Sequence, residues 1–364
     1  MMFDLPPPDI LYAALLARDP GWDGRAYVCV RTTGIFCRLT CPARKPLAKN
    51  CAFHATAGHC IEAGYRPCKR CHPLAPEAGA DPAIANLLTA LDADPGYRWT
   101  EGDLVARGHD LSTLRRVFKR HYGMTFLEMA RQRRLREGFT TLGDGGKVIE
   151  AQLDAGFASS SAFRAAFARL MGCAPGRLPR DALLRAEWIT TPLGDMIAIS
   201  SASHLHLLEF ADRKALKTEV QRLSRHAKGS LGIGSHPPGA QIRAELQRYF
   251  AGQGAGFETP LALHGSAFAR LVWQALAAIP PGETRSYSGL AAQIGRPDAV
   301  RAVARANGAN QIALVIPCHR VIGADGALTG YGGGLWRKQR LLEIEQAYQR
   351  AGPHPLTVPG VAPA

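Results

Sequence analysis

The spacing of apolar residues changes along the chain and divides it into a helical part and a mixed part. From residue 82 to about residue 179, apolar positions recur with helical spacing and few breaks other than glycine. Around residues 188–210 apolar and polar positions alternate, as in strands that bury one face. A loop rich in glycine and proline is expected at residues 228–240, and helical spacing returns at 241–250 and 266–279. The pattern therefore predicts an all-helical domain followed by an α/β region.

Proline-rich segments set the expected domain boundaries. The prolines, alanines and glycine of residues 73–82 predict a linker, so we expect a first domain at residues 1–78. The change from helical to alternating spacing predicts that the next domain covers residues 79–183. The proline-containing segment after residue 350 predicts a disordered tail at residues 351–364. A chain of 364 residues with 46% hydrophobic residues can form several cores.

Basic residues are concentrated in two blocks of a chain whose formal net charge is +14. Residues 24–73 contain nine Lys or Arg against one acid, Glu62, and residues 113–136 contain eight against Glu128. This distribution favours a polyanionic partner such as nucleic acid, with solvated surface charge as the alternative. The chain shows no signal peptide and no apolar run of membrane-spanning length, so we expect a cytoplasmic protein with no membrane partner.

Four cysteines have the spacing of a metal site. Seven of the nine cysteines precede residue 72, which in a reducing compartment favours metal binding or reactive thiols over disulfides. Cys37 and Cys41, then Cys68 and Cys71, form two knuckles that can offer four thiolates to one tetrahedral Zn²⁺. Buried or free thiols are the alternative. The neighbouring cysteines and histidines are expected to be packed or surface residues rather than ligands: Cys29, Cys51, Cys60, His54, His59 and His72.

The helical domain contains two candidate helix-turn-helix motifs. The first pairs residues 101–109 with 111–121, and the second pairs residues 148–156 with 159–170. Helical hairpins are common, so the pattern alone leaves the choice open between DNA binding and simple packing.

A cysteine, a histidine and a glutamate near the end of the chain indicate a nucleophile. Cys318 and His319 are adjacent, and Glu345 follows. An imidazole can accept the thiol proton, directly or through one water, while a carboxylate holds the ring in the useful tautomer. The motif therefore predicts a reactive thiol at Cys318.

The sequence segments around the four knuckle cysteines resemble a known protein family. Thr32 to Arg38 and Gly64 to Cys71 closely resemble the amino-terminal zinc domain of the Ada family of adaptive-response proteins. The resemblance implies that Cys37 accepts a methyl group from DNA methylphosphotriesters. It also implies that Thr33, Arg44 and Arg66 lie at the DNA face. Leu39-Thr40 stands where the family usually has Pro-Ser, with the cysteine spacing unchanged.

The second helical pair resembles another family. Ala155 to Phe163, followed by Leu170 to Pro175, looks like the AraC-type regulatory domain. Two such motifs would read successive major-groove segments of DNA. The resemblance and the helix pattern make these residues candidate DNA contacts: Ser112, Thr113, Arg116, Ser160 and Arg164.

Residues 187–350 are similar to O6-alkylguanine-DNA alkyltransferases, including Thr191 to Gly194 and Phe268 to Trp273. The resemblance implies a ribonuclease-H-like subdomain at residues 184–262 and a catalytic subdomain at 263–350. It makes Cys318 the irreversible alkyl acceptor, with these further roles: His319 as water-mediated base, Glu345 as its partner, Asn310 as the residue that orders the loop, Tyr287 as donor to the leaving group, and Arg301 as the intercalating arginine.

The same resemblance assigns the pocket wall. Tyr331 and Gly332 to Gly334 fit a flexible wall, and Lys338 fits a helix start beside it. Gln311 stands where a proline commonly follows the asparagine, and Gly332 stands where the family has serine or glycine. These positions affect pocket dynamics and substrate range.

All three regions in this order resemble the bifunctional Ada family. The resemblance implies four modules: a small α/β zinc domain, an all-α double helix-turn-helix domain, a ribonuclease-H-like α/β subdomain and a winged-helix-like alkyltransferase subdomain. It implies a single-turnover methylated-DNA–protein-cysteine S-methyltransferase that accepts methyl groups from O6-methylguanine, O4-methylthymine and methylphosphotriesters. Methylated Cys37 would make the protein a transcriptional activator. We expect a monomer that binds double-stranded DNA and RNA polymerase and associates with the nucleoid.

Two other functions stay open at the level of sequence. One is an AraC-type regulator and methylation sensor whose repair domain is inactive. The other is a structural DNA-binding protein in which zinc only stabilises a small domain.

Overall fold

The computed structural model describes residues 5–23, 26–55, 57–71, 73, 82–179, 181–324 and 326–351. The expected tail from residue 352, most of the expected linker at 73–82, and His72 lie outside the described residues. The chain divides into two compact units, residues 1–93 and 94–364.

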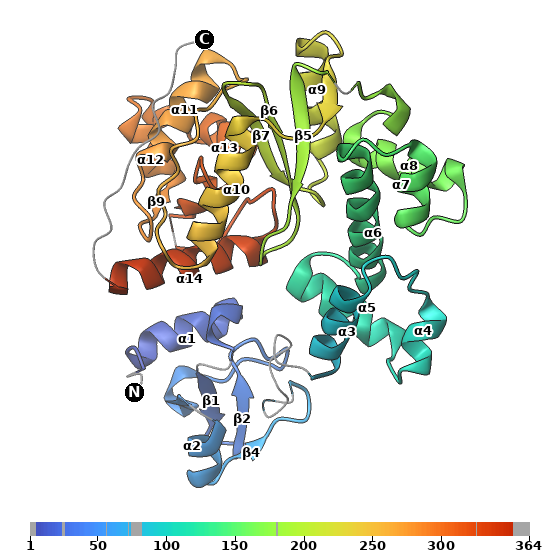
Figure 1. The fold of residues 1–364 in the computed structure, drawn as a ribbon. Coiled ribbons are helices and arrows are strands. Elements are labelled where there is room, and N and C mark those ends of the chain that lie inside the picture. The colour runs from blue at the N-terminus through green and yellow to red at the C-terminus, as the bar shows by residue number, and fades with distance from the viewer. Residues whose placement is uncertain are drawn as a thin grey trace. The chain divides into compact units, whose positions relative to one another are not determined.

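The first unit contains a four-stranded sheet with the order β3-β1-β2-β4 (Figure 1). Strand β1 pairs antiparallel with β2 and β3, and β2 pairs parallel with β4. Leu11, Leu15 and Leu39 are buried in a core that also contains the predicted zinc cysteines. The elements of this unit are α1 (Pro8–Ala17), β1 (Tyr27–Val30), β2 (Ile35–Arg38), β3 (Cys51–His54), α2 (Ala57–Glu62), β4 (Arg66–Pro67) and α3 (Pro82–Ala93).

Five helices open the second unit and contain both predicted helix-turn-helix pairs. They are α4 (Glu101–Ala106), α5 (Leu111–Tyr122), α6 (Phe126–Gly143), α7 (Val148–Asp154) and α8 (Ser160–Met171). Side-chain caps fix several starts: Asp110 accepts from the Thr113 amide at 2.7 Å, and Ser159 accepts from the Ala162 amide at 3.2 Å. Helices α4 and α7 end before the predicted limits because Gly108 and Gly156 adopt left-handed backbone angles there.

The segment with alternating apolar and polar residues forms part of a mixed sheet with the order β7-β6-β5-β8. Its elements are β5 (Leu184–Ile189), β6 (Met196–Ser200), β7 (Leu205–Phe210), α9 (Leu216–His226), β8 (Leu231–Ile233) and α10 (Pro237–Phe250). The prediction of a loop at residues 228–240 is therefore wrong in part. Strand β8 forms there because it pairs parallel with β5, and α10 starts at Pro237 because proline suits the first turn of a helix.

The remaining elements form a mainly helical layer. They are α11 (Ala267–Ala277), β9 (Arg285–Ser286), α12 (Tyr287–Gln293), α13 (Val300–Gly308), β10 (Val321–Ile322) and α14 (Leu335–Ala351). Short 3₁₀ turns also occur at Pro20–Trp22, Ala48–Asn50, Pro175–Arg177, Pro297–Ala299 and Cys318–Arg320. Helices α12 and α13 pack against each other, and Figure 1 shows them beside α11.

Both faces of the β7-β6-β5-β8 sheet are buried. Met196 and Ala198 face the core that includes α10, α11 and Cys318, whereas Ile197 and Ile199 face a core shared with α6, α8 and α9. Successive residues of a strand point to opposite faces, so the apolar run of β6 supplies both cores. One hydrophobic core therefore extends across the boundary that the sequence placed near residue 183.

Among the described residues, no helix combines the length and the hydropathy that a membrane span requires.

Candidate functional sites

The four knuckle cysteines meet at one point of the first unit. Their Sγ atoms all lie within 4.8 Å of one another, and those of Cys41 and Cys68 are 3.9 Å apart. Zn–S bonds of about 2.3 Å in tetrahedral geometry place sulfur atoms roughly 3.8 Å apart. Cys37, Cys41 and Cys68 are buried, and Cys71 is partly exposed. The donor set and its spacing fit one Zn²⁺.

The charge balance of this cluster also fits a cation. Hydrogen bonding of the Cys37 thiol to Cys71, followed by burial and the neighbouring thiols, raises the pKa of Cys37 well above its ordinary value. A divalent ion among the four sulfurs would offset this repulsion. The backbone amides of Arg38 and Arg70 also donate to Cys71 Sγ and Cys68 Sγ, each at 3.4 Å.

The two residues that depart from the family pattern have structural partners. Leu39 is fully buried, and Thr40 Oγ1 donates to Asp23 at 2.8 Å. Lys45 Nζ donates to the Leu39 carbonyl at 3.2 Å and to the Cys41 carbonyl at 3.4 Å. These contacts hold the first knuckle without the proline.

The predicted DNA-contacting residues of the first unit are exposed. Thr33 lies in the turn between β1 and β2, and Arg66 lies on β4. The two are neighbours in space because the Arg66 amide donates to the Gly34 carbonyl at 2.8 Å. Arg44 is exposed in the segment that follows Cys41.

Cys318 lies at the end of an irregular segment that connects α13 to a 3₁₀ turn. Its side chain is 6% exposed. Asn310 Nδ2 donates to Cys318 Sγ at 3.1 Å and to the Ile316 carbonyl at 2.8 Å, while Asn310 Oδ1 accepts from the Ile312 amide at 3.0 Å. Leu314, inside this segment, has a φ of 69°, an uncommon backbone conformation for a side-chain-bearing residue. Asn310 therefore holds both the loop and the thiol.

His319 belongs to a buried network around Glu345. His319 Nε2 lies 2.9 Å from Glu345 Oε1, and Arg320 donates to both carboxylate oxygens at 2.8 and 2.9 Å. Tyr249 also donates to Oε1 at 2.9 Å, and the Gly282 amide donates to Oε2 at 3.1 Å. On the other side of the ring, His319 Nδ1 is buried without a hydrogen-bond partner among the described residues.

The electrostatics of this network fix its protonation states. Burial alone would raise the pKa of Glu345, but His319 and Arg320 hold that pKa well below its ordinary value. Burial lowers the pKa of His319, against the attraction of Glu345. An ionised Glu345 therefore accepts the Nε2 proton of a neutral His319, which leaves a lone pair on Nδ1.

The thiol itself is a weak acid in this setting. Burial raises the pKa of Cys318 to about 11, although the Asn310 hydrogen bond opposes the shift. Glu209 raises the pKa of Cys318 further, whereas Arg213 and Lys338 lower it.

A small pocket opens beside Cys318, with a volume of about 10 Å³, enough for roughly one water molecule. Glu209 and Arg213 form one wall, and residues 330–333, which include predicted wall residues, form another. Glu209 Oε2 and the Tyr331 hydroxyl are buried without a hydrogen-bond partner among the described residues. Burial raises the pKa of Glu209 to about 8, although the Arg213 guanidinium opposes that shift.

Tyr287 and Lys338 form hydrogen bonds to the loop at residues 329–330, which borders this pocket. The Tyr287 hydroxyl donates to the carbonyls of Thr329 and Gly330 at 3.4 Å each. Lys338 is fully buried in the first turn of α14 and donates to the carbonyls of Val321 and Thr329. Burial lowers the pKa of Lys338 to about 8.

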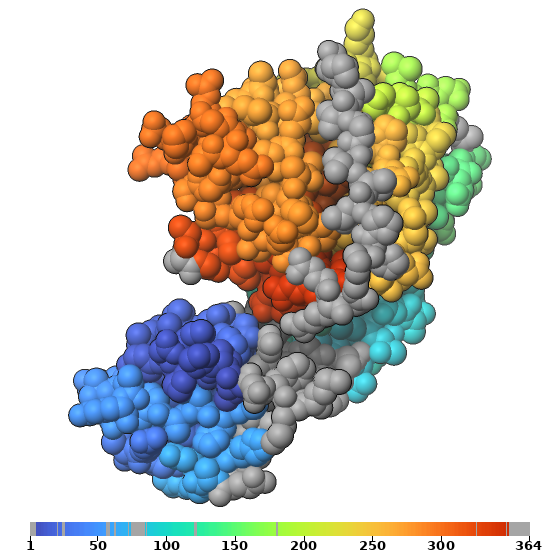
Figure 2. Space-filling model, turned by 90° about the vertical axis from the view of Figure 1, so that its left-hand side faces the viewer, coloured from blue at the N-terminus to red at the C-terminus, as the bar shows by residue number. Residues whose placement is uncertain are grey.

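The predicted DNA-contacting arginines of the second unit are also exposed. Arg116 lies on α5 and Arg164 on α8, each in the second helix of its pair. Arg301 lies in the first turn of α13. Figure 2 shows that orange atoms, the colour of residues around 300, form a large part of one face of the second unit. Ser112 and Thr113 interact with the capping Asp110, so their side chains and amides help to start α5.

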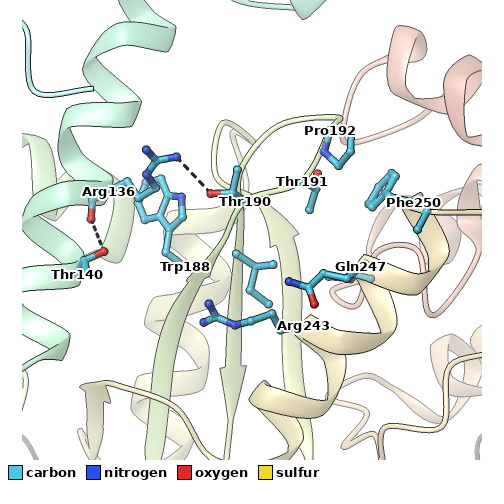
Figure 3. Close-up of a pocket in the computed structure, with 12 residues that line it drawn as sticks. Arg136, Thr140, Trp188, Thr190, Thr191, Pro192, Arg243, Gln247 and Phe250 are labelled. Carbon is cyan, nitrogen blue, oxygen red and sulfur yellow. Dashed lines mark hydrogen bonds between the residues drawn. The ribbon is translucent and has the colours of Figure 1, made fainter. Parts of the chain in front are cut away.

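A second pocket, of about 550 Å³, lies between α6, the end of β5 and α10. Figure 3 shows Arg136 and Trp188 on one side and Arg243, Gln247 and Phe250 on the other. Both arginines have partners: Arg136 donates to Thr190 at 3.3 Å, and Arg243 pairs with Glu187 at 2.6 Å. None of the residues predicted for methyl transfer lines this pocket.

Sequence reasoning missed four residues of the Cys318 site: Tyr249, Arg320, Glu209 and Arg213. Arg320 follows directly after the Cys318-His319 pair, but its partner Glu345 lies 25 positions away, so no local pattern assigns Arg320 a role. Glu209 gave a usable signal, since it is a carboxylate in strand β7, whose other residues are apolar except His206.

The fold and these sites define a multidomain protein that combines a four-cysteine metal-binding unit, two helix-turn-helix pairs and a buried thiol. Three family models match: Metal binding domain of Ada at residues 11–73, Helix-turn-helix domain at 108–181, and 6-O-methylguanine DNA methyltransferase, DNA binding domain, at 267–347. The chain is 36% identical over 350 residues to the bifunctional transcriptional activator/DNA repair enzyme Ada of Escherichia coli K12, covering 93% of this chain and 96% of that protein. The chain belongs to the Ada family.

Other relatives match parts of the chain. A methylated-DNA–protein-cysteine methyltransferase of Mycolicibacterium paratuberculosis is 49% identical over 151 residues, 41% of this chain and 92% of that protein. The crystal structure of Mycobacterium tuberculosis O6-methylguanine methyltransferase is 40% identical with a TM-score of 0.40, covering 45% of this chain and 94% of that one. The structure of the methylated N-ADA/DNA complex is 33% identical with a TM-score of 0.30, covering 36% of this chain and all of that one.

These findings confirm the predicted family, the predicted set of modules and the methyltransferase class. They also confirm the predicted cofactor, because the matched metal-binding domain contains the buried four-cysteine cluster. The chain is a DNA-binding protein.

Proposed function

We propose that this chain repairs alkylated DNA with two separate thiols, Cys318 and Cys37, and that the reaction at Cys37 switches on transcription. Cys318 accepts the methyl group of O6-methylguanine or O4-methylthymine, and Cys37 accepts that of a methylphosphotriester. The observation that carries the repair reaction is the Cys318 thiol, held at 3.1 Å by Asn310 beside a His319–Glu345 pair.

The Cys318 reaction begins with loss of the thiol proton. The proton passes through one water to Nδ1 of His319, whose lone pair is available because Nε2 donates to Glu345. Sγ then attacks the methyl carbon, the bond from carbon to O6 breaks, and guanine keeps the electron pair. The thiol proton ends on N1 of guanine. A thioether is a poor leaving group, so each chain reacts once at this site.

Substrate entry requires the pocket to widen. A volume of about 10 Å³ cannot hold a purine, so residues 330–333 move when the base leaves the duplex. Arg301 fills the vacated position in the stack, and Tyr287, released from the carbonyls of residues 329 and 330, donates to the leaving base.

The Cys37 reaction takes place at the metal-binding cluster. Bound Zn²⁺ keeps the cysteine sulfurs as thiolates at neutral pH. Cys37 Sγ forms a bond to the methyl carbon while the bond from that carbon to the phosphate oxygen breaks, which leaves a phosphodiester anion. Thr33, Arg44 and Arg66 position the DNA backbone for this attack.

Methylation of Cys37 changes the charge of the cluster. Four thiolates around one Zn²⁺ carry a formal charge of about 2−, and conversion of one thiolate to a thioether halves that charge. Repulsion of DNA phosphates falls, and promoter DNA is then bound through α5 and α8 with Arg116 and Arg164. The activated protein acts as a monomer on the nucleoid and recruits RNA polymerase.

Peptide mass mapping tests this function. The zinc-loaded full chain is mixed with duplex DNA that carries both methylphosphotriesters and O6-methylguanine, and each cysteine peptide is weighed. We expect the added mass of one methyl group on Cys37 and on Cys318 and none on Cys173, which serves as an internal control. Methyl on Cys37 alone would favour a sensor with an inactive repair domain, and methyl on neither thiol would overturn the proposal. Cys318→Ser should leave methylation of Cys37 intact.

A further inference from the structure

Arg213, just after β7, is tied to the loop that carries the catalytic asparagine. Its side chain is 6% exposed. Arg213 Nη1 donates to the Asn310 carbonyl at 2.9 Å, and Nη2 donates to the Gly308 carbonyl at 2.9 Å. Two buried carboxylates hold the guanidinium, Glu209 at 2.7 Å and Glu219 at 3.2 Å. The planar fork of an arginine can satisfy several such acceptors at once.

Asn310 connects the Arg213 contact to the reacting sulfur of Cys318. The same Asn310 whose carbonyl accepts from Arg213 donates its side-chain amide to Cys318 Sγ. The segment between Asn310 and Cys318 forms no regular helix or strand pairing apart from a single bridge between Leu208 and Ile312. Arg213 therefore anchors the loop end that the catalytic amide depends on.

The opposite side of the guanidinium faces the glycine-rich wall. A Cβ atom at Gly332 would lie 2.7 Å from Arg213 Nε and 3.2 Å from Cζ. Atoms this close cannot both be accommodated without movement of one of them. The guanidinium thus occupies the space that a side chain at position 332 would need.

We propose that Arg213 is a positioning residue for methyl transfer to Cys318, and that position 332 is a glycine because Arg213 needs that space. The inference rests on the proposed transfer reaction at Cys318. It also gives a reason for glycine rather than serine at position 332, since a serine there would displace the guanidinium.

Arg213 also contributes charge to the thiol. Arg213 and Lys338 favour the Cys318 thiolate, and Glu209 disfavours it. Loss of Arg213 removes one of these two cations and leaves two buried carboxylates unpaired, so the pH at which the thiol ionises should rise. Tyr287 and Tyr331 also interact with the thiol electrostatically, and His319 follows Cys318 in the chain.

The test measures single-turnover methyl transfer to Cys318 from a duplex with one O6-methylguanine, as a function of pH, in the full zinc-loaded chain. The variants are Arg213→Ala, Arg213→Lys and Gly332→Ala. The matched controls are Arg225→Ala, an exposed arginine of the neighbouring α9, and Gly176→Ala, an exposed glycine whose new Cβ meets no atom within 4 Å. Duplex affinity and thermal unfolding are measured in parallel.

We expect the transfer rate to fall about 100-fold in Arg213→Ala and about 10-fold in Gly332→Ala, because a displaced reacting group loses rate steeply. The rising limb of the pH profile should move to higher pH in Arg213→Ala. Arg213→Lys keeps the charge but not the fork, so it should keep the wild-type pH profile at a rate about 10-fold lower. Duplex affinity should be unchanged in all variants.

The possible outcomes distinguish failure of the positioning role of Arg213 from failure of the proposed methyl transfer to Cys318. If the wild-type chain transfers no methyl group to Cys318, the proposed function fails. If the wild-type chain reacts and the folded Gly332→Ala and Arg213→Lys variants react at the wild-type rate, the positioning role is overturned. An unshifted pH profile in a folded Arg213→Ala protein would overturn the charge contribution.

Discussion

Nε2 of His319 and Oε1 of Glu345 lie 2.9 Å apart, and neither side chain is accessible to solvent. The same carboxylate pairs with Arg320, so one buried anion organises both a base and a cation. Breaking a buried pair by removing one charge leaves the partner uncompensated, which typically costs about 3–5 kcal/mol.

Glu345→Gln should therefore damage both stability and repair. We expect the free energy of unfolding to fall by about 3 kcal/mol, because Arg320 loses its counter-charge. The transfer rate at Cys318 should fall by about 100-fold, since His319 no longer has a fixed tautomer. Denaturant unfolding and single-turnover kinetics measure the two effects. Glu343→Gln, at a partly exposed position of the same helix, should have little effect on either, and equal effects in both variants would contradict the assigned role.

Metal binding should depend on the knuckle cysteines alone. Native mass spectrometry of the wild-type chain should show one Zn²⁺, and Cys41→Ser should weaken zinc binding by at least about 100-fold because it removes a thiolate ligand. Cys51→Ser changes a thiol of the same unit that lies outside the cluster, so its zinc content should stay at one. Retention of zinc by Cys41→Ser at wild-type affinity would rule out the four-cysteine site.

Acid should destabilise the second unit through a histidine pair. His206 Nδ1 lies 2.8 Å from His264 Nε2, and burial, then His264, His204 and His226, lower the pKa of His206 to about 4. The unfolded chain, with a histidine pKa near 6.5, binds a proton that the folded chain rejects. This group's contribution is complete above about pH 6.5 and is lost as pH falls towards 4, by about 1 kcal/mol near pH 5 after allowance for the solvent screening of a partly exposed ring.

His206→Gln should reduce that acid sensitivity. Thermal or denaturant unfolding at pH 7.5 and pH 5 should show a smaller difference for this variant than for the wild type. His109→Gln, in the turn between α4 and α5, should keep the wild-type difference. The assignment is excluded if the two variants respond to acid alike.

DNA affinity should depend on single arginines of the helix-turn-helix pairs. Arg164→Ala should weaken promoter binding and reduce the slope of log affinity against log salt by about 1 if the residue contacts a phosphate. Arg116→Ala on α5 should behave similarly. Arg169→Ala, on a different face of α8, is the control, and titrations by fluorescence anisotropy at several salt concentrations give the slopes. Unchanged affinity in both Arg116 and Arg164 variants would remove these helices from the interface.

Local signals in the sequence were enough for much of this protein. Cysteine spacing predicted the zinc cluster, and the adjacent Cys318 and His319 located the second reactive thiol. Helix starts at Asp110 and Ser159 follow from their short polar side chains, which cap amides a few residues away. In each case the interacting atoms are close in sequence as well as in space.

Long-range relationships could not be read in the same way. Arg213 meets the Asn310 carbonyl across 97 positions, and no local spacing records that contact. Strand β8 has three residues and exists because β5 offers it a parallel partner. The choice of Cys37 as acceptor rests on family likeness, since burial alone makes Cys71 the more accessible thiol.

The small pocket beside Cys318 has a consequence for the protein after repair. A space of about 10 Å³ holds roughly one water, so a methyl group on Cys318 Sγ would take up nearly all of it. Extra carbon in a packed interior typically costs about 1–3 kcal/mol. We therefore expect a chain methylated at Cys318 to unfold more often than an unmodified chain and to be degraded faster by proteases.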